Sequence, residues 1–330
     1  MGSKRTAPGL KKEEKVFSRI LILHTGGTIS SKVSKTGGVD VSSISKKDKK
    51  EERTLFSILS ENLNFVYLNK LIQEIQNVKT HPLQAIIITH GTDTLPYTAC
   101  FLSFFFSSLS FPLFLVGAQK SPDRPTSERE LLLKNIKKKI SLFKCGVFVP
   151  VFSEKTKKIE FIPGIYCKKI HTSQKKCFID LSKGCKSKKL ERRALENISF
   201  SKKIGCIYPT PFTDISLFEQ VLTRNKIIIF FGSGMGHLNE KTSSFLNQKK
   251  WKKKIFVIVS TCFLGKTNPF IYKTGRKLRA AGFIFSQLPS FEATFAKCSI
   301  GYKIKKKKFE EFLNNTNICG ELELVENTIL

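Results

Sequence analysis

Acidic residues are scarce in this sequence. It has 26 Asp and Glu against 57 Lys and Arg, which gives a formal net charge of +31 and a pI of about 9.9. Such an excess attracts anionic surfaces without specifying one. The lysines come in runs, and aromatic residues are not interleaved with them as in a stacking platform for nucleic acid. Because phenylalanine is also abundant, at 29 residues, we interpret the lysines as a composition bias on exposed positions and expect no specific nucleic-acid partner.

Metal-binding and redox motifs are missing as well. The nine cysteines are scattered, with no C-x-x-C pair and no Cys/His spacing typical of zinc. This pattern predicts reduced thiols in a cytoplasmic protein. The first residues, MGSKRTAPGLKKEEKVFSR, are polar and lack the apolar core of a signal peptide. The one long apolar stretch, residues 99–118, is interrupted by four serines and Pro112, which favours a buried helix, a loop and a strand over a membrane span.

Apolar runs and one-sided helical stripes alternate along the chain. This alternation predicts an α/β fold with parallel sheets. The expected strands of the first half are Ile20–Leu23, Asn64–Leu68, Ala85–Thr89, Leu113–Val116 and Gly146–Phe152, with helices at Tyr67–Asn77, Leu95–Phe106 and Glu128–Leu142. The second half is expected to contain strands at Cys206–Tyr208, Ile227–Phe230 and Ile255–Ser260, with helices at Ser216–Thr223, Lys241–Asn247, Lys273–Ala281, Phe291–Ser299 and Phe309–Asn314.

A polar, charged segment separates the two halves. Residues 180–203 read DLSKGCKSKKLERRALENISFSKK and have few apolar positions. We therefore predict a larger N-terminal parallel-sheet domain over 18–185, a linker over 186–204 and a smaller C-terminal α/β domain over 205–330.

Two loops carry hydroxyls directly after buried strands. The first, HTGGTIS at 24–30, follows the strand at Ile20–Leu23, and the second, THGTDTLPYTA at 89–99, follows AIIIT. Open α/β sheets bind ligands at the carboxyl ends of their strands. If the two strands are neighbours, Thr25, Thr28, Thr92 and Asp93 converge on one crevice. Helix capping by Thr92, Asp93 or Thr94, with Pro96 in the first turn, explains part of the second loop but not the paired hydroxyls.

A threonine hydroxyl is a poor nucleophile until a base takes its proton. A lysine held out of water against a threonine and an aspartate can serve as that base, because burial lowers the pKa of a lysine.

With TGGTI after the first strand and HGTDT after a later one, the chain resembles the bacterial-type asparaginase/glutaminase family, and most of all its cytoplasmic type I form. The resemblance continues through LVGAQ at 115–119, YCKKIHTSQKKCF at 166–178, FFGSGMGHL at 230–238 and the segment 260–284. It implies the two-domain asparaginase-like fold, with no metal and no organic cofactor.

The resemblance also implies roles for individual residues. Thr25 matches the primary nucleophile, which attacks a side-chain amide and forms an acyl-enzyme ester. Thr92, Asp93 and Lys169 match a proton-transfer set. Substrate would be bound by Ser60, Thr28, Gly91, Thr92 and Asp93, and backbone N–H groups of the two glycine loops would stabilise the oxyanion.

Three functions are compatible with these motifs. The first is an L-asparagine amidohydrolase acting on asparagine or glutamine, as a homodimer or homotetramer away from membranes. The second is the asparaginase-like subunit of a tRNA-dependent amidotransferase, although only about 18 residues precede the first strand, where that class has a further domain. The third is a member that binds an amino acid without turnover, motivated by the altered segment TSERE at 126–130 and a missing tyrosine near Gly38.

Overall fold

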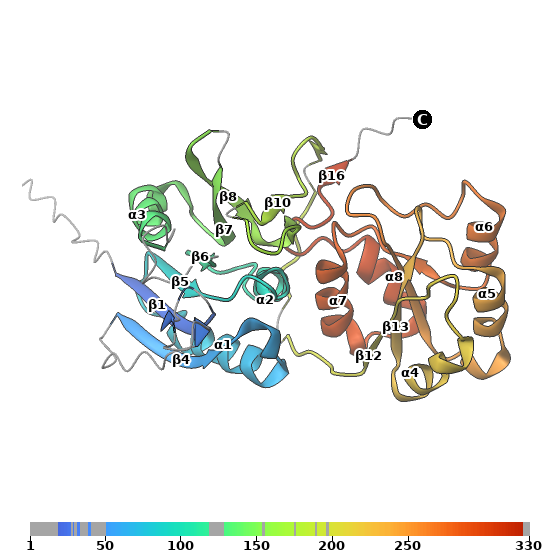
Figure 1. The fold of residues 1–330 in the computed structure, drawn as a ribbon. Coiled ribbons are helices and arrows are strands. Elements are labelled where there is room, and N and C mark those ends of the chain that lie inside the picture. The colour runs from blue at the N-terminus through green and yellow to red at the C-terminus, as the bar shows by residue number, and fades with distance from the viewer. Residues whose placement is uncertain are drawn as a thin grey trace, which may run out of the picture.

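The computed structural model describes residues 19–27, 29, 32–33, 39–40, 51–118, 129–153, 156–174, 176–188, 190–195 and 198–325. Within these ranges the chain forms two α/β units that lie side by side (Figure 1). The fold is therefore the expected one, with a larger parallel-sheet unit first and a smaller α/β unit second.

The first unit surrounds a six-stranded sheet of order β4-β1-β5-β6-β7-β8. Its strands are β1 (Ile20–Gly26), β4 (Glu52–Ile58), β5 (Ala85–Thr89), β6 (Pro112–Val116), β7 (Gly146–Ser153) and β8 (Lys158–Pro163). The first five strands in this order, β4, β1, β5, β6 and β7, pair in parallel, and β8 pairs antiparallel with β7. β1 and β5 are direct neighbours, with His24 opposite Thr89, so the loops after their carboxyl ends meet.

Three α-helices pack against this sheet, α1 (Phe65–Val78), α2 (Leu95–Phe105) and α3 (Arg129–Lys139). α1 begins at Phe65 because the Asn64 side chain accepts hydrogen bonds from the N–H groups of Val66 and Tyr67, satisfying donors that the first helical turn leaves open. α2 is buried along nearly its whole length, which explains its continuous apolar sequence.

Short elements complete both units and their connections. They are the antiparallel pairs β2 (Lys32–Val33) with β3 (Val39–Asp40), β9 (Cys167–Lys169) with β10 (Phe178–Asp180), and β11 (Lys186–Ser187) with β16 (Leu324–Val325). Single 3₁₀ turns occur at η2 (Ser60–Asn62), η3 (Ile140–Leu142), η4 (Gly164–Tyr166), η5 (Ile215–Leu217), η6 (Lys249–Trp251) and η7 (Gly301–Lys303).

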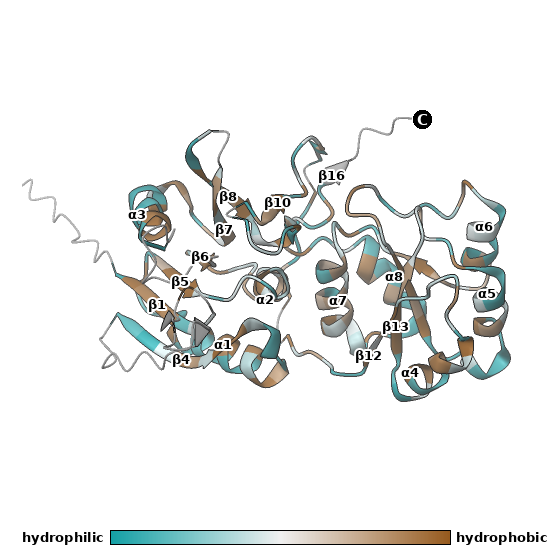
Figure 2. Ribbon diagram, viewed as in Figure 1, coloured by the Kyte–Doolittle hydropathy of each residue, from teal (hydrophilic) through white to brown (hydrophobic). Residues whose placement is uncertain are grey.

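The second unit has a four-stranded parallel sheet of order β12-β13-β14-β15. Its strands are β12 (Ile204–Ile207), β13 (Ile227–Gly232), β14 (Ile255–Ser260) and β15 (Ile284–Phe285). The helices around it are α4 (Phe218–Arg224), α5 (Glu240–Leu246), α6 (Lys273–Ala280), α7 (Phe291–Ile300) and α8 (Lys306–Asn314). Figure 2 shows apolar strands in both sheets and polar outer faces on α3 and α5.

The two units share one hydrophobic core. α2 packs against α7 between the sheets (Figure 1), and the buried cluster that contains Leu23 of β1 extends to Val257 of β14. Aromatic rings cross this boundary, with Tyr97 edge-on to Phe291 and Phe65 stacked on Phe295. An apolar interface of this kind fixes the relative position of the two units.

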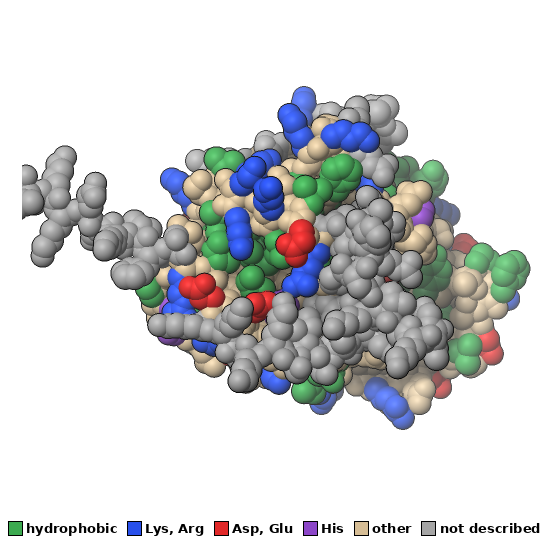
Figure 3. Space-filling view, turned by 60° about the vertical axis from the view of Figure 1, so that its left-hand side comes forward, with side chains coloured by type: hydrophobic (Ala, Val, Ile, Leu, Met, Phe, Trp, Pro, Cys, Tyr) green, Lys and Arg blue, Asp and Glu red, His purple; other side chains and the backbone are tan. Residues whose placement is uncertain are grey.

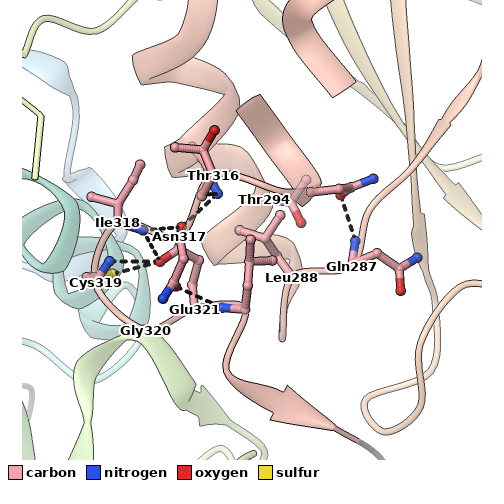
Figure 4. A network of polar contacts seen from close by, with 12 residues as sticks. Gln287, Leu288, Thr294, Thr316, Asn317, Ile318, Cys319, Gly320 and Glu321 are labelled. Atoms are coloured by element: carbon pink, nitrogen blue, oxygen red, sulfur yellow. Dashed lines mark hydrogen bonds and ion pairs between the residues drawn. The ribbon is translucent and has the colours of Figure 1, made fainter. Parts of the chain in front are cut away.

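A buried ion pair holds the C-terminal segment on α7. Lys297 Nζ lies 2.7 Å from Glu321 Oε1, and both side chains are 0% exposed. Figure 4 shows Glu321 also accepting hydrogen bonds from the N–H groups of Ile318 and Cys319. Lys297 donates further to the carbonyl of Thr316, and burial lowers the pKa of its ammonium group.

One element predicted from the sequence is wrong, and several others were not predicted. Residues 64–68, expected as a strand, instead cap and begin α1. The strand that pairs with β1 on that side is β4, whose sequence ERTLFSI is charged at its start and half-buried. β8, β9 and β10 were not predicted, and 180–203 contains β11 rather than only a linker.

The apolar stretch at 99–118 folds as predicted, into α2, a short loop and β6. None of the helices in the described part of the chain combines the length and apolarity needed to cross a bilayer.

Candidate active site

Thr25 lies buried at the carboxyl end of β1. Its hydroxyl donates a 2.7 Å hydrogen bond to the carbonyl of Thr89, the last residue of β5, and its residue exposure is 3%. The bond aims the Thr25 side chain toward the loop that follows β5. The two hydroxyl-bearing loops therefore converge as the sequence predicted.

Glycines allow these loops to approach backbone to backbone. Gly27 has φ +77°, and a Cβ at this position would stand 2.3 Å from the amide nitrogen of Gly91. A Cβ on Gly91 would in turn meet Ser60 Oγ at 2.6 Å. Ser60, from η2, is thereby placed beside the second loop, buried at 4% exposure. A side chain at either glycine would separate the three segments.

Lys169 joins Thr92 to Asp93. Its Nζ lies 2.8 Å from Thr92 Oγ1 and 2.6 Å from Asp93 Oδ1, and it reaches them from β9, more than 70 residues along the chain. Thr92 is buried and the Lys169 side chain is 15% exposed, whereas the Asp93 side chain is 62% exposed. Thr92 is therefore shielded from solvent, whereas the Asp93 carboxylate is accessible to solvent and to a charged group of a ligand.

The structure brings Thr25, Ser60, Gly91, Thr92, Asp93 and Lys169 to the carboxyl edge of the first sheet, where they form the candidate active site. Thr28 lies outside the described residues, as do Gly38, Ser127 and Glu128, so what the sequence suggests for them stays a prediction. Thr94, expected as a helix cap, forms no side-chain cap; its hydroxyl donates to the carbonyl of Ser60 at 2.8 Å. Gly27 N–H donates to the carbonyl of Ile58, which removes it from the predicted oxyanion donors.

Two histidines support the strand ends and loops of the candidate active site and were not predicted to do so. His24 connects three strands, with Nδ1 3.0 Å from Thr89 Oγ1 and Nε2 2.7 Å from Glu52 Oε1. It could not be assigned this role because β4, which carries Glu52, was not predicted. His90 lies 2.7 Å from the carbonyl of Gly91 through Nδ1 and 2.9 Å from Thr98 Oγ1 through Nε2. Burial lowers the pKa of His90 to about 4, which keeps its ring neutral.

A second lysine on β9 contacts the other unit. Lys168 Nζ lies 2.8 Å and 3.0 Å from the two carboxylate oxygens of Glu292, in the first turn of α7. Neighbouring residues on a strand point to opposite faces, so Lys169 faces Thr92 while Lys168 faces the second unit. Nothing in the local sequence predicted this pair.

His171 is part of a turn, where its Nδ1 accepts hydrogen bonds from the N–H groups of Ser173 and Gln174. Among the described residues, no group of three or more His, Cys, Asp or Glu side chains is arranged to hold a metal ion.

Comparison with known proteins identifies the family. The model of the family described as "Asparaginase, N-terminal" matches residues 19–185. The D subunit of glutamyl-tRNA(Gln) amidotransferase from Saccharolobus solfataricus is 31% identical over 92% of this chain and 76% of the relative. The corresponding subunit from Sulfolobus acidocaldarius is 27% identical over 94% of this chain and 77% of that protein. The chain belongs to the asparaginase family.

Solved structures show the same fold. The thermostable L-asparaginase from Thermococcus kodakarensis superposes with a TM-score of 0.77 over 92% of this chain and 99% of its own, at 20% identity. L-asparaginase I from Vibrio cholerae gives 0.73 over 93% and 99%, at 21% identity. At these identities the likeness concerns architecture alone.

Proposed function

We propose that this protein hydrolyses the side-chain amide of a small amino acid, asparagine or glutamine, and releases ammonia. The observation that carries the proposal is the convergence of Thr25 with the Thr92–Lys169–Asp93 set at one strand edge. Ligands of open α/β sheets bind at this edge. We infer the reaction class from the family, and we infer the candidate residues from their contacts.

The proposed reaction has two steps. Thr25 Oγ1 attacks the amide carbon, the proton of its hydroxyl passes to the amide nitrogen, and the C–N bond breaks so that ammonia leaves an ester on Thr25. Water then attacks the ester carbon, the Thr92–Lys169 pair takes a proton from this water, and a proton returns to Thr25 Oγ1 as the ester bond breaks and the acid is released. The amides of Gly91 and Thr92 are the candidate oxyanion donors. Asp93, whose side chain is 62% exposed, would pair with the α-ammonium group of the substrate, and Ser60 would bind its α-carboxylate.

The released ammonia has two candidate destinations, which are free solution and the active site of a partner amidotransferase subunit. The motifs by themselves favoured a free L-asparaginase of the cytoplasmic type I form. The relatives that are 31% identical carry the name of a glutamyl-tRNA(Gln) amidotransferase subunit, and they support the second candidate, a subunit that supplies ammonia to an amidotransferase, at least as well. In that case a second protein subunit is the partner.

Ammonia release from asparagine and from glutamine tests the shared reaction. We expect turnover with the natural chain, a loss of roughly 10³-fold or more in Thr25→Ala, and retained turnover in Thr25→Ser, which keeps a hydroxyl. Thr223→Ala, in an exposed turn of α4, is the matched control. Mass spectrometry of acid-quenched enzyme should detect an ester on the peptide that contains Thr25. An enzyme that binds either amino acid without releasing ammonia or forming this ester contradicts the proposal.

The same assay separates the two destinations. Efficient turnover of free asparagine by the chain alone supports the free asparaginase. Slow turnover that rises when a partner subunit and glutamyl-tRNA(Gln) are added supports the amidotransferase.

A further inference from the structure

Three neighbouring strands of the second sheet each begin directly after a lysine. Ile204 of β12 pairs with Ile227 of β13, and Ile227 pairs with Ile255 of β14, so these strands start at the same level. The residues immediately before them are Lys203, Lys226 and Lys254. Because adjacent strands lie about 4.8 Å apart, the three lysines form a row along the amino-terminal edge of the sheet.

Hydrogen bonds join further basic segments to this row. Lys226 Nζ donates to the carbonyls of Tyr302 and Ile304 at 2.6 Å and 3.3 Å, which brings the start of α8 alongside it. Lys254 Nζ donates to the carbonyls of Thr223 and Asn225 at 3.2 Å and 2.7 Å. Lys306 Nζ donates to the carbonyl of Lys252 at 2.9 Å. Segments that are up to about a hundred residues apart in the sequence thus form one continuous surface.

We call this surface the lysine ridge and define it as residues 202–203, 224–226, 249–254 and 303–308. These segments contain fourteen Lys and Arg and no Asp or Glu. Of the ion pairs found among the described residues, a single one, between Lys250 and Glu219, includes a member of the ridge. On the face in Figure 3, by contrast, acidic, neutral and apolar side chains lie among the basic ones.

Two features indicate that the ridge is built for an anion rather than filled by composition. α8 begins at Lys306 with lysines in its first turn and no acidic residue there, although the positive end of the helix dipole disfavours cations. Burial also lowers the pKa values of Lys254 and Lys306, because partial removal from water disfavours their charged forms. The negative charge of a bound polyanion would offset both effects.

The large apolar side chains in and beside the ridge are not exposed. Trp251 of the ridge is buried, as are Phe309 and Phe312, which follow the ridge in α8, and the large hydrophobic residues that are exposed in the described part of the chain lie in other segments. A surface that inserts into a membrane combines basic residues with exposed apolar ones. The ridge therefore fits a phosphate backbone, whose charges repeat every few ångströms along each strand, better than a lipid surface.

We propose that the lysine ridge binds the phosphate backbone of a folded RNA, without reading its sequence. This inference goes beyond the proposed reaction, because the ridge lies on the second unit and includes none of the residues of the candidate active site. The choice of RNA over DNA rests on the proposed connection to tRNA. The proposal revises the expectation, drawn from composition, that the protein has no specific nucleic-acid partner.

Fluorescence anisotropy with a labelled tRNA transcript tests the ridge. The ridge variant Lys252→Gln/Lys253→Gln/Lys307→Gln/Lys308→Gln removes four exposed charges from the second unit. The control variant Lys134→Gln/Lys137→Gln/Lys138→Gln/Lys144→Gln removes four exposed charges from the first unit. At 0.1 M KCl we expect the ridge variant to bind roughly tenfold or more weakly and the control to change by less than about twofold. The slope of log Kd against log salt should fall by about 0.9 for each phosphate that the ridge variant no longer neutralises.

Four outcomes would overturn the inference. Equal weakening in both variants means that RNA binding reflects total charge alone. If the natural chain does not bind the tRNA transcript, RNA is excluded as the ligand of the ridge. If the natural chain binds a DNA duplex equally well or more tightly, the choice of RNA over DNA is wrong. Binding to phosphatidylcholine–phosphatidylserine vesicles that the ridge variant loses, without binding to RNA, assigns the ridge to a membrane surface. Ammonia release by the ridge variant is measured in parallel, so that failure of this inference and failure of the proposed reaction are distinguished.

Discussion

The ammonium group of Lys168 lies 2.8 Å from a carboxylate oxygen of Glu292, and this pair connects the strand that carries Lys169 to the second unit. The Lys168 and Glu292 side chains are 17% and 8% exposed, so the pair is largely removed from water. Breaking such a pair leaves a charge without a partner in a poorly solvated place. β9 therefore depends on α7 for its position.

We expect Glu292→Gln to lower the free energy of unfolding by about 3 kcal/mol and to reduce kcat for amide hydrolysis more than it changes KM. The physical reason is that Lys169 is displaced from Thr92 when its neighbour loses its partner. Urea denaturation and steady-state kinetics provide the two measurements. The matched control is Glu219→Gln, which breaks the exposed pair with Lys250 and should cost less than about 1 kcal/mol. Equal effects of the two substitutions would contradict a positioning role.

Gly27 should be irreplaceable for a steric reason in addition to its backbone conformation. A Cβ there would overlap the amide of Gly91 at 2.3 Å, whereas Gly184, with a similar positive φ of +83°, has nothing within 4 Å. Gly184→Ala should therefore cost only the strain of the left-handed conformation, about 1–2 kcal/mol. Gly27→Ala should cost more and should also abolish ammonia release. Thermal unfolding of both variants measures the difference, and similar losses in the two would show that the close approach is unimportant.

The buried pair of Lys297 and Glu321 should be the most sensitive charge interaction in the second unit. Both side chains are fully buried, and Glu321 also binds the N–H groups of Ile318 and Cys319 (Figure 4). Glu321→Gln should destabilise the fold by about 3–5 kcal/mol. The double variant Lys297→Met/Glu321→Gln should recover part of this loss, because it removes the charge that the single variant leaves unpaired. Chemical denaturation of the single and double variants checks this non-additivity.

Stability should fall in mild acid because of His90. Burial lowers the pKa of this histidine from 6.5 to about 4, so between these pH values the unfolded chain binds a proton that the folded chain does not. The stabilisation is present above pH 6.5 and is lost as the pH falls toward 4, by about 3 kcal/mol in total. Protonation of Nε2 would also end its role as acceptor for Thr98.

Urea denaturation from about pH 7 to about pH 4.5 measures this loss. His90→Gln should flatten the pH dependence, whereas the control His81→Gln, at an exposed position, should leave it as in the natural chain. An unchanged profile in His90→Gln would assign the acid sensitivity to other groups.

Local sequence signals were sufficient for most of the fold. Continuous apolar runs such as AIIIT and IFVIVS predicted β5 and β14 with their observed bounds, because strands buried on both faces leave no room for polar residues. β4 was missed because it is half-buried and begins with Glu52 and Arg53, whose partners, His24 and Glu74, come from elements far away in the sequence. Edge strands of this kind are stabilised by contacts that no local window contains.

The sequence by itself determined the two threonine loops and the order of the elements that present them, since glycines and hydroxyls directly after apolar strands are local facts. Only the tertiary structure decided which carbonyl holds Thr25, that Gly27 N–H is already bonded to Ile58, and that Lys168 and Lys169 face different units. It also turned lysine runs that looked like composition bias into one continuous ridge. The reason is physical: sheet register and domain packing bring distant residues to within hydrogen-bond distance, and neither is written in the spacing of residues along the chain.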